Sequence, residues 1–180
     1  IETVETLVAE GLSPSDRQLR EALLPIIDDA PDAAAEAPNF QRVLREVDRY
    51  LASRPAPRST AGAAYNPEVA ELRRLLAGRS IVLIGGERRV EAHEKLRAAL
   101  EVAELHWLTT QPHESIDRFE RYVARADVAV VIQLIRFSSP CFGDVDAFCR
   151  RHGKPFVRLT GGYNPNQVAA QVLQQCSERL

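Results

Sequence analysis

Residues 80–180 alternate four times between a short apolar run and a longer segment with the apolar period of a helix. The third run, DVAVVIQLI at 127–135, is apolar almost throughout. Such runs are typical of parallel strands that are buried on both faces. Four strand–helix units in a row predict a parallel sheet with right-handed crossovers. We therefore expect an α/β, Rossmann-like fold with strand order 2-1-3-4, in which the first and third strands are central.

The bounds of these elements follow from where the apolar period changes. We expect strands at 80–86, 104–109, 127–135 and 155–160, and helices at 90–102, 115–125, 143–152 and 164–180.

The first part of the chain has a helical period instead. Helices are expected at 1–10, at 13–24 with Ser13 as the cap, and at 39–54, whose apolar face runs from Phe40 to Leu51. Composition indicates a loop at 28–38. The expected organisation is a helical segment at 1–53, a linker at 54–66 and the α/β domain at 67–180, with a first helix at 67–77 packing on that domain.

The overall composition excludes several classes of protein. The formal net charge is -2, which is too balanced for wholesale nucleic-acid or membrane binding. The sequence contains no run of about 18 apolar residues, and its first residues lack the basic region of a signal peptide. Three cysteines, an odd number at irregular spacing, favour a reducing compartment, and we expect the cytoplasm. Because the chain contains no methionine, we interpret it as a processed chain or a fragment.

The candidate ligand site lies where the strand order reverses, beyond the carboxyl ends of strands one and three. Loops at this edge are rich in Gly, Ser and Arg. Helix N-termini and arginine forks bind phosphate oxygens, glycines allow close backbone approach, and a tyrosine can stack on a base. We predict a phosphorylated small molecule or nucleotide as the ligand. The predicted binding residues are Gly85, Gly86, Arg88, Arg89, Arg136, Ser138, Ser139, Gly161, Gly162 and Tyr163.

The alternative for this edge is a plain strand-to-helix turn, with the arginines paired to Glu87, Glu91 or Asp144 at the surface. The stretch GGERRVEAHEK matches neither the P-loop pattern nor G-x-G-x-x-G. Phosphate binding would therefore have to come from several loops jointly.

The sequence assigns no catalytic residue and names no cofactor. Cys141 precedes a helix that would lower its pKa, but the arginine of a phosphatase loop is missing at Ala147. His113 is the histidine placed at the ligand edge, where a surface role is the default. Cys149 and Cys176 are expected in the core, His93 in solvent and His106 half-buried. Acidic residues near helix starts are usual for dipole reasons, so we expect no metal site at Glu87, Asp144 and Asp146.

The stretches IGGE, ADVAVVI, FSSPC and FCRRHGKPFVRL resemble an uncharacterised bacterial family, domain of unknown function 2325. The resemblance spans 81–160. It implies a small Rossmann-like fold that is often appended to other domains, and it implies no activity.

These observations favour a non-catalytic ligand-sensing or regulatory module that binds its ligand at the carboxyl edge of the sheet. In this hypothesis the helical segment dimerises or passes the signal to a partner. One alternative is an enzyme that acts on nucleotides or phosphoesters. Another is a protein–protein interaction module without a ligand, in which the Phe40–Leu51 face binds a partner or a second copy through Val43 and Val47. Nucleic-acid binding is a weaker hypothesis.

Overall fold

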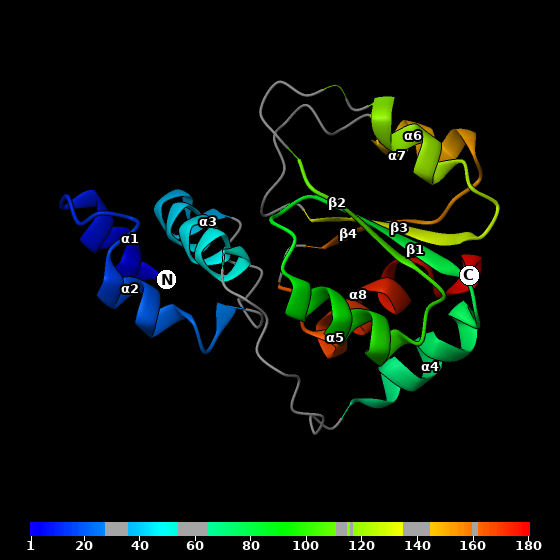
Figure 1. The fold of residues 1–180 in the computed structure, drawn as a ribbon, viewed down its shortest axis with the longest axis horizontal. Helices are drawn as coiled ribbons and strands as arrows, with labels where there is room; N and C mark the ends of the chain where they lie inside the picture. Colours follow the sequence, from blue (N-terminus) through cyan, green and yellow to red (C-terminus); the bar gives the residue numbers. More distant parts are fainter. Residues whose placement is uncertain (28–35, 54–64, 111–114, 116, 135–144, 160–161) are drawn as a thin grey trace.

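The structure is a computed structural model that describes residues 1–27, 36–53, 65–110, 115, 117–134, 145–159 and 162–180 (Figure 1). Within these ranges the chain forms a helical unit at 1–53 and an α/β unit at 65–180, which lie side by side. No helix in the described ranges has the length and hydropathy needed to cross a bilayer.

The sheet confirms the predicted topology. Its four strands are all parallel and lie in the order β2-β1-β3-β4. The central strand β3 is buried at every position, as its continuous apolar run predicts. The strands are β1 (Ser80–Ile84), β2 (Leu105–Leu108), β3 (Val128–Leu134) and β4 (Phe156–Leu159).

Helices cover both faces of this sheet (Figure 1). One face carries α4 (Pro67–Leu76), α5 (Val90–Leu100) and α8 (Pro165–Cys176), which pack around the larger apolar cluster. The other face carries α6 (Asp117–Val123) and α7 (Val145–Arg151) over a smaller cluster. A short 3-10 turn at Ser177–Arg179 follows α8. This arrangement places the carboxyl ends of the strands at one edge, on the side of the helical unit.

The helical unit has a core of its own. It consists of α1 (Glu2–Ala9), α2 (Arg17–Leu23) and α3 (Pro38–Ala52), and both shorter helices contact α3. Val43 and Val47, on the predicted apolar face of α3, have no exposed surface. This face is therefore occupied within the chain, and aspartate at either position would disrupt the helical unit itself.

Two local predictions need correction. The N-cap of α2 is Asp16 and not Ser13, because the Asp16 carboxylate accepts hydrogen bonds from the backbone N–H groups of Gln18 and Leu19. The sixth helix, α6, is shorter than expected and begins at Asp117, whose N–H group is bonded to the Ser115 hydroxyl at 3.2 Å.

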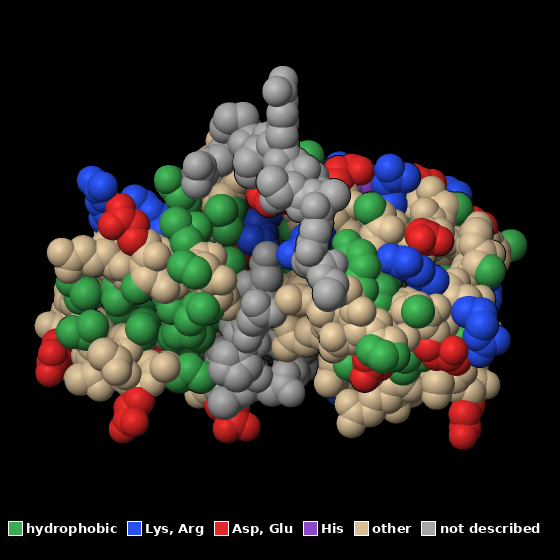
Figure 2. Space-filling view, turned by 90° about the horizontal axis from the view of Figure 1, so that it is seen from below, with side chains coloured by type: hydrophobic (Ala, Val, Ile, Leu, Met, Phe, Trp, Pro, Cys, Tyr) green, Lys and Arg blue, Asp and Glu red, His purple; other side chains and the backbone are tan. Residues whose placement is uncertain are grey.

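Figure 2 shows how surface side chains are distributed on one face of the molecule. Hydrophobic side chains gather on the helical unit, and three of the large exposed ones, Ile1, Leu7 and Ile26, belong to it. Positive and negative side chains alternate over the α/β unit on this face. That alternation agrees with the nearly balanced net charge.

A glutamine side chain occupies the free edge of β4. The Gln175 Oε1 atom accepts the Arg158 N–H at 3.0 Å, and its Nε2 atom donates to the Arg158 carbonyl at 2.9 Å. The side-chain amide of α8 thus takes the place of a fifth strand at this residue. Edge strands with unpaired backbone groups can pair with another chain. The Gln175 side chain acts as a clamp that satisfies both backbone groups of Arg158 at this edge.

We expect Gln175→Glu to lower the free energy of unfolding by about 1 kcal/mol, because a carboxylate cannot donate to the Arg158 carbonyl. Gln174→Glu is the matched control, since it adds the same charge one residue away on the same helix. Urea denaturation of both variants measures the difference. Equal losses in the two variants would contradict a stabilising clamp.

Candidate functional site

The glycine turn after β1 is fixed by its neighbours on both sides. Gly85 and Gly86 have φ angles of 108° and 66°, which favour glycine. A Cβ atom on Gly85 would lie 3.1 Å from the carbonyl oxygen of Leu134, at the end of β3. On the other side, the Trp107 Nε1 atom donates to the Gly85 carbonyl at 3.0 Å. The turn therefore lies closely packed between the ends of β2 and β3.

A buried arginine follows this turn. Arg89 is the residue before α5 and is only 6% exposed. Its guanidinium carbon lies 4.5 Å from the centroid of the Tyr163 ring, within the range of a cation–π contact. Tyr163 in turn packs on Trp107, with 4.6 Å between the ring centroids. Arg89 and Tyr163 therefore lie against one another at the carboxyl edge of the sheet, where a ligand is predicted.

The partner of this arginine comes from the helical unit. Asp48 of α3 has no exposed surface, and its Oδ1 atom lies 3.4 Å from the Nε atom of Arg89. In Figure 1, α3 lies on the side of the α/β unit where β1 ends and α5 begins. A carboxylate from the first part of the chain is therefore bound at the edge where a ligand anion is predicted.

Asp48 is not among the residues that the sequence predicted for this edge. A weak signal was present, because Asp48 lies four residues after Leu44 and three before Leu51, and therefore flanks the apolar face of α3. A charged residue at that position is usually solvated, and nothing in the local pattern indicates a partner 41 positions further along the chain.

The other predicted binding residues fall into two groups. Arg88 is exposed, whereas Gly162 is buried and donates its N–H to the Gln167 Oε1 atom at 3.1 Å. The structure therefore places Gly85, Gly86, Arg88, Arg89, Gly162 and Tyr163 at this edge. Outside the described residues lie Arg136, Ser138, Ser139 and Gly161, together with His113 and Cys141.

Both cysteines and two of the histidines in the described ranges are buried. Cys149 and Cys176 are free and buried, as predicted, and burial raises the pKa of the Cys149 thiol to about 12. The prediction that His93 is solvated was wrong: the side chain is buried, and its Nε2 atom lies 2.9 Å from the Leu105 carbonyl oxygen. His106, which was expected to be half-buried, is also buried, with 7% of its surface exposed. In the described part of the chain, no three His, Cys, Asp or Glu side chains form a group that could hold a metal ion.

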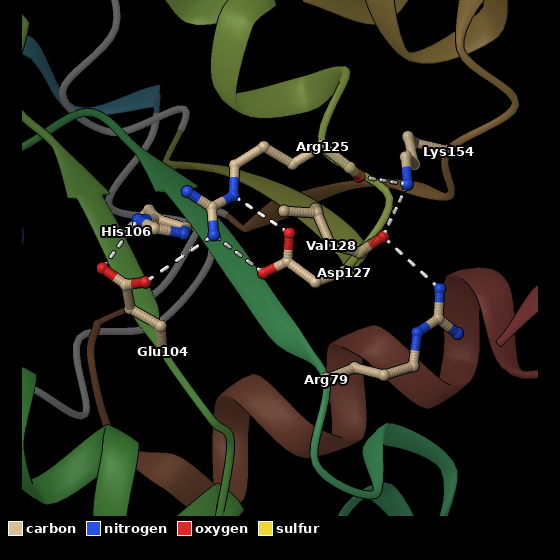
Figure 3. A network of polar contacts seen from close by, with 7 residues as sticks. All are labelled: Arg79, Glu104, His106, Arg125, Asp127, Val128 and Lys154. Atoms are coloured by element: carbon tan, nitrogen blue, oxygen red, sulfur yellow. Dashed lines mark hydrogen bonds and ion pairs between the residues drawn. The ribbon is translucent and has the colours of Figure 1, made fainter.

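At the opposite, amino edge of the sheet, charged side chains bind one another and nearby backbone carbonyls (Figure 3). Arg125 binds the Asp127 carboxylate through two hydrogen bonds of 3.0 and 3.1 Å, and these bonds hold the pKa of Asp127 far below its usual range. The Lys154 ammonium donates to the carbonyls of Arg125 and Val128, at 2.7 and 2.8 Å. Arg79 also donates to the Val128 carbonyl. These side chains join the turns before the strands to one another, which is a structural role.

No family model, curated protein or solved structure matches this chain. The resemblance to domain of unknown function 2325 therefore stays a prediction.

We expect Gly85→Ala to be more destabilising than Gly78→Ala. Gly78 has a φ of 72° and open space around its Cβ position, so alanine there costs roughly 1 kcal/mol of backbone strain. At Gly85 the close Leu134 carbonyl adds to the strain, for a total of roughly 2–3 kcal/mol. Thermal unfolding of both variants measures the difference, and similar midpoints would contradict the close packing of the turn.

Removing the buried carboxylate should be far more costly than removing an exposed one. We expect Asp48→Ala to lower the free energy of unfolding by roughly 3 kcal/mol, because the Arg89 charge stays behind. Glu46→Ala breaks an exposed pair with Arg49 on the same helix and should cost about 1 kcal/mol or less. Denaturant titration compares the two.

The double variant Asp48→Leu/Arg89→Met tests the same pair from the other direction. It removes both charges and should recover most of the stability lost in Asp48→Ala, since apolar groups of similar volume replace buried ion pairs at little cost. A double variant as unstable as the single one would contradict this account.

Proposed function

We propose that this chain is a non-catalytic ligand-sensing or regulatory module. It binds a phosphorylated small molecule or nucleotide at the carboxyl edge of the sheet, between the ends of β1 and β3. The observation that carries the proposal is the buried guanidinium of Arg89, which engages an anionic oxygen of Asp48 at this edge. An arginine fork in such a position suits carboxylate or phosphate oxygens.

The local backbone supports an anion here. Helix α5 has 11 residues, and its first N–H groups point toward this edge. Its N-cap residue is Arg89, and an arginine side chain has no oxygen to accept those N–H groups. The glycine turn just before it allows the backbone to approach a ligand closely. Charge and backbone thus favour the same class of ligand.

The remaining predicted residues complete the proposed site. Exposed Arg88 lies in the same turn as Arg89. The sequence adds Arg136, Ser138, Ser139 and Gly161 to the loops predicted at the same edge. Tyr163 is 1% exposed and packs on Trp107 and Arg89, so its proposed role is to support the arginine and not to stack on a base.

Signal output is proposed to pass through the helical unit, because that unit contributes Asp48 to the site. A partner protein or a second copy would respond to the position of this unit. We further propose that the module works in the cytoplasm, since the two cysteines in the described residues are free thiols.

The single tryptophan of the chain reports on this site, because Trp107 contacts both Gly85 and Tyr163. We expect its fluorescence to change on titration with inorganic pyrophosphate, AMP or glucose 6-phosphate. The bound ligand should also stabilise the fold, by about 2.7 kcal/mol at 100 times its dissociation constant.

The variant Arg88→Ala/Arg136→Ala should lose both responses. Arg150→Ala/Arg151→Ala is the matched control, since it removes two charges from α7, away from the proposed site. If no probe changes either the fluorescence or the thermal unfolding of the wild-type chain, the proposed function is refuted.

A further inference from the structure

We propose that Asp48 occupies the position of the ligand's anionic group on Arg89, so that ligand binding and docking of the helical unit exclude each other. The inference rests on the proposed function and assigns its regulation. In this scheme the arrangement with Asp48 on Arg89 is the closed one, and the ligand releases α3 from the sheet edge.

The geometry of the pair supports competition. Arg89 has 7% of its side chain exposed and the Asp48 side chain has none, so water has little access to the pair. The guanidinium is also held against the Tyr163 ring, which fixes its position. An incoming anion that is to contact the Nε edge of Arg89 must take the place of the Asp48 oxygen, which lies 3.4 Å from that nitrogen.

Charge determines which anion can displace Asp48. A carboxylate carries one negative charge, whereas a terminal phosphate group carries about 1.5 to 2 at neutral pH. Phosphate oxygens also suit a bidentate arginine contact. A phosphorylated ligand therefore has the differential affinity for the open state that a shift of the equilibrium requires.

The covalent link between the two units opposes this displacement. Asp48 is part of the same chain, so its effective concentration at Arg89 is high. The apparent affinity of a ligand is reduced by the small fraction of molecules that are open. Weakening the Asp48 contact should therefore raise the measured affinity, which is the opposite of what loss of a binding residue would do.

The first test compares wild type with Asp48→Asn in a titration with AMP and with inorganic pyrophosphate, followed by Trp107 fluorescence. Asparagine keeps the shape and removes the charge. We expect the dissociation constant to fall about tenfold or more in this variant. Glu46→Gln is the matched control on the same helix, because Glu46 pairs only at the surface with Arg49, and its dissociation constant should equal that of wild type.

The second test uses wild type alone and therefore does not depend on the folding of a variant. Backbone hydrogen exchange is measured with and without saturating AMP or pyrophosphate. We expect exchange in α3 to become faster and exchange in the first turn of α5 to become slower when the probe binds.

The outcomes separate the inference from the function on which it rests. If a probe binds wild type but Asp48→Asn binds it no more tightly, or α3 exchange does not accelerate, the inference is overturned and the proposed function stands. If neither protein responds to either probe, both are overturned. Tighter binding by Asp48→Asn together with faster α3 exchange supports the inference.

Discussion

The ion pair between Asp48 and Arg89 connects the two halves of this protein. Burying each charge costs several kcal/mol, and neither can lose its partner cheaply. The contacts continue from the pair into the sheet, because Arg89 stacks on Tyr163, Tyr163 packs on Trp107, and Trp107 donates to the Gly85 carbonyl. A continuous path of contacts therefore runs from α3 to the turn at the end of β1.

The two edges of the sheet differ in how their polar groups are used. At the amino edge, Lys154 and Arg79 donate to backbone carbonyls of the neighbouring turns, and Arg125 binds Asp127 through its Nε and Nη2 atoms. These contacts lie within one unit and join segments that stay together. At the carboxyl edge the Asp48–Arg89 pair joins segments from different units, each of which has an apolar core of its own.

The fold was predictable because its signals are local. Continuous apolar runs marked the strands, and the alternation with helices implied the parallel order that the sheet has. The site was only partly predictable. A strand-to-helix turn with Gly85 and Arg89 could be placed at the correct edge from topology alone. The pairing of Arg89 with Asp48 could not be predicted, because it depends on how two separate cores dock. His93 was misjudged for a similar reason, because its bond to the Leu105 carbonyl is a tertiary contact.

A stabilising role alone is a weak explanation for the buried pair. Apolar residues of similar volume often stabilise such a position as well as an ion pair or better. The helical unit already buries Val43 and Val47 on the same helix and has no need of a charge for its own core. An ion pair differs from an apolar contact in one respect that matters here: its strength depends on whether a competing ion is present. At an edge where topology places ligands, that dependence gives a physical reason for a charge at the point where the two units meet.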